Sequence, residues 1–531
     1  MAPGHSDGFN WFISLLDHSF IERCFDSLDQ QLLDAIEREA TNVQTFIFLL
    51  PQLILFLSVV LVFSVDLMGS KEKKWLPYLA LAGALLSLAV SIFLFGWVDI
   101  GEKSVLGGML ALDSFSLFFQ IFASLVATMV ILLSMAYMEL KSPYQGEFYS
   151  FILLACFSIS LLALSSDLVM VFIAFELLSI SSYILTGFLR KDPRSSEAAI
   201  KYFLYGSMAS AMMLYGMSLL YGATSSTNLV EIARGLAGVD QGLKWVIYPA
   251  IVMLVVGFGF KTASAPFHQW SPDAYEGAPT PVTAFLAVGS IGAGFAIIVR
   301  VMLTALPDFQ INWVAILTGL SIVSMTLGNF VAISQKNIKR LLAYSGIAHA
   351  GYIMIGLISW ESGVFDTVFD GISGVLVYLL VYLAANLGAF AVVVAFENKT
   401  GSNQIEDYAG LIKRSPLLAG AMVVFLLSLI GIPGTGGFVG KLLVFGAALR
   451  VEYYFLALIA IINSVVAGFY YLNVIRYMFF QPLDEPDREG IELPVSLSTA
   501  VIIACVFTLL MGILAQPFIQ FVQSSLGLVT S

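Results

Sequence analysis

Four ionisable residues lie inside long apolar segments, where a charge is costly. They are Glu176, Lys201, Lys261 and Lys441. A charged side chain at the centre of a bilayer costs roughly 2.5–3.5 kcal/mol even on the lenient insertion scale, so such residues are functional by default. Amines and carboxylates held at this depth can take up and release protons. The pattern therefore predicts proton transfer within a membrane.

Two of the four charges are expected to form a pair. Asp192-Pro193 has the form of a helix start, with Asp as N-cap and Pro at the first position. Lys201 then lies roughly 12 Å into that helix, and Glu176 lies roughly 18–20 Å back from Arg190. We expect Glu176 and Lys201 to interact and to act as a proton switch. A static structural ion pair is the alternative.

The other two lysines stand beside interruptions of apolar segments. The residues before Lys261 read GFGF, with Pro266 just beyond it, and the residues before Lys441 read GIPGTGGFVG. Gly and Pro free backbone groups that hydrocarbon cannot satisfy, so such breaks belong where helices line a wet cavity. We expect Lys261 and Lys441 to be proton sites, with snorkelling to an interface as the alternative.

Two histidines are further candidates for a relay. His349 lies in an apolar segment, and His268 lies in the polar loop PFHQWSPDAYEG, which also holds Asp273 and Glu276. A core histidine that only satisfies its own hydrogen bonds is the alternative for His349. A loop that ties helices together is the alternative for the second group. No arrangement of His, Cys, Asp and Glu predicts a metal site, and we expect no cofactor in this chain.

Composition sets the class of protein. Of 531 residues, 59% are hydrophobic and only 11% are charged, whereas soluble domains run near 45–50% and 25%. The surrounding solvent must therefore be lipid. A net charge of −11 argues against nucleic acid as a partner. Three scattered cysteines without a CxxC motif predict neither a disulfide nor a redox centre.

Apolar segments of about 20 residues predict an all-α membrane protein of about fourteen spans. Residues 1–45 form an amphipathic N-terminal extension, 46–525 the transmembrane domain and 526–531 a short tail. The expected spans are 46–68, 76–98, 111–137, 147–165, 167–189, 193–222, 243–265, 280–304, 311–334, 338–359, 371–396, 416–447, 453–479 and 495–522.

The basic residues give the orientation. With residue 1 outside, fifteen of the 25 Lys and Arg residues fall in inner loops, six lie outside and four lie within spans. The positive-inside rule therefore places both termini on the outer side. Broken spans in corresponding positions, here the seventh and twelfth, are typical of inverted repeats. We expect two inverted five-helix repeats, at about 147–304 and 311–479.

Four long motifs resemble one known family. They are FKTASAPFHQWSPDAYEGAPTPV (260–282), NIKRLLAYSGIAHAGY (337–352), RSSEAAIKYFLYGSM (194–208) and SLIGIPGTGGFVGK (428–441). Over roughly residues 46–525, the chain resembles the N subunits of NADH-quinone oxidoreductase, called subunit 2 in other nomenclatures of respiratory complex I. Related Mrp-type antiporter subunits share the fold but carry a different version of the PDxxEGxP loop.

The resemblance implies a proton-translocating role in the membrane arm of the complex. FMN, iron–sulfur clusters and quinone are expected in partner subunits, and the M and K subunits and small neighbours are the expected contacts. The expected location is the inner membrane of a bacterium, with periplasmic termini. By position, Glu176 corresponds to the family's fifth-span glutamate and Lys201 to its partner. Lys261 and Lys441 correspond to the lysines of the broken spans.

One position departs from the family pattern. The resemblance leads us to expect a lysine after a serine in the eighth span, but here Ile291 follows Ser290. We expect His349, or a hydrated polar cluster that includes Ser290, to bridge Lys261 and Lys441 instead. Two other functions stay open: a cation/proton antiporter subunit of the Mrp type, and a structural subunit that no longer conducts.

Overall fold

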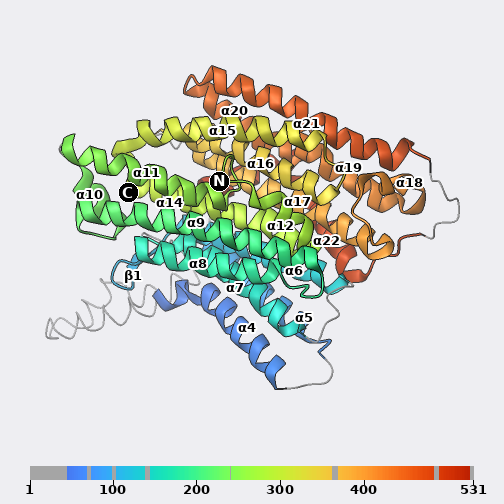
Figure 1. Ribbon diagram of the computed structural model, residues 1–531. Helices are drawn as coiled ribbons and strands as arrows, with labels where there is room; N and C mark the ends of the chain where they lie inside the picture. Colours follow the sequence, from blue (N-terminus) through green and yellow to red (C-terminus); the bar gives the residue numbers. More distant parts are fainter. Residues whose placement is uncertain are drawn as a thin grey trace, which may run out of the picture.

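The computed structural model describes residues 45–68, 73–97, 103–137, 144–238, 241–361, 369–482 and 490–526. In these ranges the chain is a bundle of long, roughly parallel helices (Figure 1). The expected amphipathic extension and C-terminal tail lie almost wholly outside the described residues. Thirteen helical stretches in the described ranges are long and apolar enough to cross a membrane. The twelfth span is split into two shorter helices, which accounts for the fourteenth crossing.

The elements follow in chain order. They are α4 (Leu50–Leu67), α5 (Leu76–Trp97), β1 (Lys103–Val105), β2 (Leu110–Leu112), α6 (Ser114–Ala136), α7 (Gln145–Leu164), α8 (Leu168–Thr186), α9 (Pro193–Thr224), α10 (Leu229–Leu236), α11 (Gln241–Lys261), α12 (Trp270–Gly277), α13 (Thr280–Phe285), η2 (Leu286–Ser290), α14 (Ile291–Ala305), η3 (Pro307–Phe309), α15 (Gln310–Ile333), α16 (Ile338–Ile358), α17 (Gly371–Thr400), η4 (Ile405–Tyr408), α18 (Leu411–Arg414), α19 (Pro416–Ile430), α20 (Gly436–Arg450), α21 (Tyr454–Phe480), α22 (Val495–Ile513) and α23 (Ala515–Gln523).

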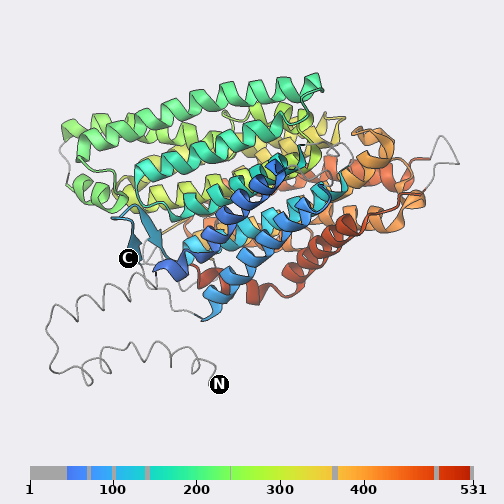
Figure 2. The same cartoon turned by 90° about the horizontal axis from the view of Figure 1, so that it is seen from below.

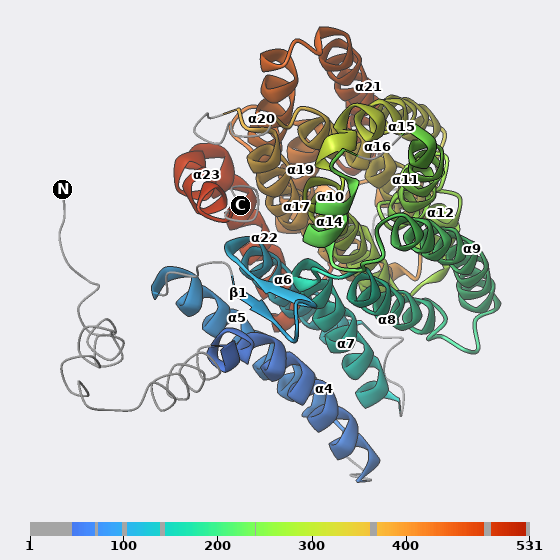
Figure 3. The same ribbon diagram turned by 90° about the vertical axis from the view of Figure 1, so that its left-hand side faces the viewer.

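The centre of the bundle is formed by α6, the α13–α14 span, α16 and α17. These helices are buried on nearly every side, whereas α4, α5 and α21 leave most of their surface for lipid. The end-on view in Figure 3 shows α17 and α14 inside a ring of other helices, and Figure 2 shows α4 and α5 crossing one flank. A helix that is apolar all round is what a buried span requires.

Both predicted breaks are present and are closed in the same way. Helix α11 ends at Lys261, where Ala263 adopts a left-handed φ of +53° and the Ser264 amide donates to the Gly259 carbonyl at 2.8 Å. Helix α19 ends before Gly431, which has a φ of +92°. There the Ile432 amide donates to a carbonyl five residues back, at 3.0 Å. This is the Schellman form of helix ending, which satisfies part of the freed backbone.

The eighth span carries a different irregularity. A short π-helical turn, η2, separates α13 from α14. Single π turns inside α-helices often occur at functional sites, because the extra residue redirects the side chains around it. Ser290, the last residue of η2, lies against the end of α11.

The expected all-α membrane fold is confirmed, with one small β-hairpin added to it. Strands β1 and β2 pair antiparallel between the second and third spans. Gly107 and Gly108, with φ of +68° and +93°, make the turn between them. The third span consequently starts at Ser114 rather than near 111, because Asp113 caps it by accepting from the Ser116 amide at 2.7 Å.

Two connections have matching geometry. Helix α9 ends at Ser225 in the left-handed region, and Asn228, three residues later, bridges to Asp167 before α8. Helix α17 ends at left-handed Gly401, and Gln404, three residues later, bridges to Asn337 before α16. These two strand-like bridges lie at the starts of α8 and α16. The bounds predicted for the repeats stay a prediction.

Candidate functional site

Lys261 lies at the break of the seventh span and is fully buried. Its Nζ donates to the hydroxyl of Ser179 on α8 at 3.0 Å and stands 5.0 Å from the centre of the Phe175 ring. The carbonyl of Lys261, freed by the helix ending, accepts a long hydrogen bond of 3.5 Å from Ser290. The break therefore holds the amine against α8 and its backbone against the eighth span.

Glu176 occupies the turn of α8 between Phe175 and Ser179, the two residues that Lys261 contacts. Its Oε1 is buried and has no hydrogen-bond partner among the described residues. The two charges interact electrostatically but do not form a direct ion pair. Lys261, which has no acidic neighbour in sequence, is therefore the cation that the fold brings to Glu176.

The expected pair of Glu176 and Lys201 is wrong. Helices α8 and α9 run antiparallel, and a Cβ on Gly187 would lie 2.8 Å from the Cβ of Ala199. This contact fixes the register, so Lys201 is level with about residue 185 and not with Glu176. Nine residues of α-helix separate those levels, roughly 13 Å. Counting depth from the loop between the helices missed this offset.

Lys201 instead belongs to an ion-pair cluster at the end of the bundle where α9 begins, the end that the charge pattern predicts to be the inner one. Its Nζ lies 2.7 Å from Glu197 and 2.9 Å from Asp273 on α12. Arg340 on α16 binds Asp273 and Glu276, each at 2.9 Å. These residues line a cavity of about 270 Å³. The polar loop thus joins α9 to α16.

Asp273 is the centre of this inner cluster. Burial raises the pKa of its carboxyl, but hydrogen bonds and charges from Lys201 and Arg340 outweigh that effect and hold the pKa below its usual 3.8. Asp273 is therefore ionised at neutral pH. It fits a structural tie between helices better than a proton carrier.

Lys441 lies at the second break, on α20. Its Nζ donates to the carbonyls of Leu429 and Ile430 at 3.1 and 2.7 Å and to the Ser464 hydroxyl at 2.8 Å. An ammonium has three donors, and all three are used here. The carbonyls belong to the C-terminal turn of α19, where the helix dipole favours a cation. Lys441 also borders a largely apolar cavity of about 670 Å³ between α20 and α21.

His349 connects to Lys441 through aromatic side chains. Its Nδ1 lies 2.8 Å from the Tyr378 hydroxyl and its Nε2 lies 3.4 Å from the Tyr471 hydroxyl. The ring of Tyr352 packs 5.8 Å from the His349 ring, and the Lys441 Nζ stands 4.8 Å from the centre of the Tyr352 ring. His349, which the sequence predicts to relay protons, therefore lies near Lys441, on a buried face of α16.

His268 lies apart from this line of residues, in the connection between α11 and α12. Its Nδ1 is buried and has no hydrogen-bond partner among the described residues. Burial lowers the pKa of the imidazole, and a backbone hydrogen bond to Pro266 only partly opposes it. A pKa lowered from 6.5 makes His268 a neutral imidazole at pH 7.

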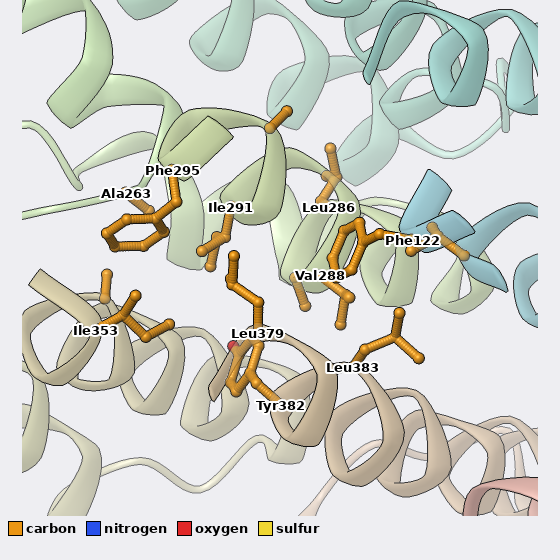
Figure 4. Close-up of a cluster of buried hydrophobic side chains, with 14 of the residues drawn as sticks. Phe122, Ala263, Leu286, Val288, Ile291, Phe295, Ile353, Leu379, Tyr382 and Leu383 are labelled. Atoms are coloured by element: carbon orange, nitrogen blue, oxygen red, sulfur yellow. The ribbon is translucent and has the colours of Figure 1, made fainter. Parts of the chain in front are cut away.

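Ile291 stands in an apolar cluster between the eighth and eleventh spans. Figure 4 shows it facing Leu379 and Tyr382 on α17, with Phe295, Val288 and Leu286 beside it. The side chain is 1% exposed. No proton site is available at this position, as the sequence predicts.

Sequence reasoning missed several neutral residues of the site. Ser179 and Ser464 each receive a lysine hydrogen bond. Tyr352, Tyr378 and Tyr471 surround His349. Serine and tyrosine are frequent in membrane helices for other reasons, so their type alone gives no signal. Their proximity to the charged residues depends on helix register.

The comparisons with known proteins all indicate the same family. The family model described as "NADH:quinone oxidoreductase/Mrp antiporter, TM" matches residues 165–467. The chain is 40% identical over 490 residues to NAD(P)H-quinone oxidoreductase subunit 2 of Synechocystis, covering 90% of this chain and 92% of the relative. It is 40% identical over 462 residues to NADH-quinone oxidoreductase subunit N of Trichlorobacter lovleyi, covering 87% and 92%.

Solved structures agree with this fold. A chain of respiratory complex I from Thermus thermophilus has a TM-score of 0.74 at 33% identity, covering 88% of this chain and 98% of the other. A chain of the Mrp complex from Dietzia has a TM-score of 0.80 at 20% identity, covering 92% and 98%, and shows a shared fold alone. The chain belongs to the NADH:quinone oxidoreductase/Mrp antiporter family of membrane subunits, among relatives named subunit N or subunit 2.

Proposed function

We propose that this chain is a proton-translocating membrane-arm subunit of an NADH:quinone oxidoreductase. It acts as part of a translocase in the inner membrane of a bacterium, beside the M and K subunits. Electron transfer from NADH to quinone takes place in partner subunits that hold FMN and iron–sulfur clusters. The observation that carries the proposal is the placement of Lys261 and Lys441 at two helix breaks, each bound by neutral groups.

Neutral partners favour proton exchange over permanent pairing. A lysine held by a hydroxyl and an aromatic face keeps stabilising contacts as a cation, and it loses no ion pair when it gives up its proton. Glu176, whose Oε1 is unpaired, lies one helical turn from the Lys261 contact and is the carboxylate that interacts electrostatically with Lys261. A shift that closes the distance between them would load the proton, and a shift that opens it would release the proton.

Two alternatives make different predictions. A subunit that no longer conducts fits the apolar cluster at Ile291, which interrupts the charged residues between Lys261 and Lys441. A cation antiporter of the Mrp type would work without a redox partner, and its support is the shared fold. The first would leave proton yield unchanged when Glu176 is replaced. The second would copurify without flavin or iron–sulfur subunits.

The test replaces the buried carboxylate within the assembled complex. Glu176→Gln keeps the shape of the side chain and removes its charge, so the number of protons moved per electron should fall while assembly is retained. The measurement is proton uptake by vesicles carrying the complex, divided by NADH oxidised. The matched control is Glu406→Gln, an exposed carboxylate in η4. An unchanged ratio in the Glu176 variant would contradict the proposal.

A further inference from the structure

The apolar cluster around Ile291 lies between the Lys261 side of the molecule and His349. We infer that a chain of buried tyrosine hydroxyls, those of Tyr202, Tyr275 and Tyr382, together with water bound beside Gly346, carries protons across it. This inference rests on the proposed function and adds the residues that complete its path. The three tyrosines come from α9, α12 and α17, so the fold, and not a local motif, brings them together.

The three hydroxyls share one property. Each tyrosine is at most 1% exposed, and each hydroxyl oxygen lacks a hydrogen-bond partner among the described residues. Next to them, the hydroxyl of Ser271 and both amide atoms of Asn386 are buried and unpaired as well. Buried polar groups are nearly always hydrogen-bonded, and leaving one unpaired costs about 1–3 kcal/mol. A cluster of them in one region therefore calls for bound water.

Gly346 on α16 lies close to two of the three hydroxyls. A Cβ at this position would lie 3.1 Å from the Tyr382 hydroxyl, 4.0 Å from the Tyr275 hydroxyl and 3.7 Å from the Cδ1 of Ile291. The Tyr382 and Tyr275 hydroxyls therefore both face the backbone of α16 at Gly346, where one water between them could bridge the two, and Ile291 forms an apolar wall beside Tyr382 (Figure 4). Any side chain at this position would press on the Tyr382 hydroxyl, because its Cβ would already be in tight contact with it.

Both ends of the chain meet residues of the candidate site. Tyr202 lies close to the hydroxyls of Ser182 and Ser290 without a direct hydrogen bond to either. Ser290 in turn contacts the carbonyl of Lys261. At the other end, the Tyr382 ring packs 5.1 Å from the ring of His349. The order from one lysine to the other is therefore Ser290, the tyrosines, His349 and then Lys441.

Hydroxyls can pass a proton without becoming ions. Each is one donor and two acceptors. A proton bonds to a lone pair on the tyrosine oxygen while the original O–H proton leaves to the next water or hydroxyl, so each oxygen ends with one proton and no charge. Trp270 stacked on Tyr202 at 4.2 Å holds that ring in place. The rings need no movement beyond rotation of the C–O bond.

The first test removes single hydroxyls in the intact complex. Tyr382→Phe and Tyr275→Phe keep the rings and should slow proton translocation roughly tenfold, since a positioned proton-transfer group often contributes about 100-fold. Tyr408→Phe is the matched control, because Tyr408 is buried with an unpaired hydroxyl but lies in η4, against Phe396. The readout is protons moved per NADH oxidised, with complex content measured in parallel.

A second measurement does not depend on activity. A high-resolution structure of the complex should show ordered water beside Gly346 within hydrogen-bond distance of the Tyr275 and Tyr382 hydroxyls. Gly346→Val should displace that water and block translocation, whereas Gly420→Val, at an open position on α19, should not. A dry contact at Gly346 would overturn the inference.

Lys261→Met separates the two proposals. If it lowers proton yield while Tyr382→Phe and Tyr275→Phe leave it unchanged, the tyrosine chain is refuted and the proposed function stands. If Lys261→Met itself leaves proton yield unchanged, the proposed function fails and the tyrosine chain fails with it. A fall in all three variants, with Tyr408→Phe unaffected, is the expected result.

Discussion

Buried cations in this protein are stabilised in two different ways. Arg300 on α14 is 1% exposed and forms two hydrogen bonds to the Asp113 carboxylate, at 2.5 and 3.0 Å, and two to the Ala163 carbonyl. Lys441 has only carbonyls and a hydroxyl. The first arrangement is a closed ion pair, in which each charge has a direct partner of opposite sign. The second leaves the amine free to lose its proton.

The Arg300 pair should act on stability and not on translocation. Arg300→Met would leave the Asp113 carboxylate buried without its cation, which typically costs about 3–5 kcal/mol. We expect a lower thermal midpoint of the purified complex and reduced assembly. The double variant Arg300→Met with Asp113→Asn removes both charges while Asn can still cap α6. It should recover part of the loss.

The double variant decides the interpretation. If it is as unstable as Arg300→Met alone, the loss comes from packing and not from an uncompensated charge. Proton yield per electron in whatever complex does assemble should equal that of the unsubstituted protein in both variants.

At the scale of elements, each of the two helix breaks positions a buried lysine, but the two breaks have opposite geometry. At the first, the lysine is the last residue of the helix that ends, and it reaches sideways to α8. At the second, the lysine lies on the helix that begins, and it reaches back to the carbonyls of the helix that ended. Both breaks place an amine where backbone groups have left the helical pattern.

These breaks could be predicted from sequence, and the partners of the lysines could not. Gly and Pro in an apolar run indicate a break wherever they occur, because the cause is local. Whether Glu176 faces Lys201 or Lys261 depends on how two antiparallel helices are offset. That offset is fixed by the contact of Gly187 with Ala199, which no local pattern reveals. The tyrosine hydroxyls beside Gly346 depend on three helices at once, so they were missed for the same reason.

The inner ion-pair cluster makes a prediction about pH. The pKa of Asp273 is lowered in the folded protein below its usual 3.8. The stabilisation by its ion pairs is therefore fully present above about pH 4 and is lost as the pH falls through the lowered pKa. Asp273→Asn should lower the thermal midpoint at pH 7, by an amount equivalent to about 1 kcal/mol because the pairs are partly exposed.

The measurement is the difference in thermal midpoint between the two proteins across pH. It should be constant from pH 7 to pH 5 and shrink toward zero below pH 3.8. It should also shrink in high salt, which screens partly exposed charges. A difference that grows on acidification would show that Asp273 contributes by another route.

At the scale of the whole molecule, the charged groups divide between the two ends of the bundle. Helices α12 and α18 lie at one end, and α10 with the β1–β2 hairpin lies at the other (Figure 1). The first end carries Arg340, Lys201, Lys413 and Arg414, so the positive-inside rule predicts that this end faces the cytoplasm.

This division predicts the side of the C-terminus. Helix α23 lies at the same end as α10 and the hairpin (Figures 1 and 3), and its Phe521 packs 4.6 Å from Phe95 near the end of α5. A reporter fused after Ser531 should therefore be active only on the periplasmic side. The same reporter inserted after Gly401, at the opposite end, should be active only in the cytoplasm. Cytoplasmic signals from both fusions would contradict the prediction, because the three crossings expected between Gly401 and Ser531 must place the two fusions on opposite sides.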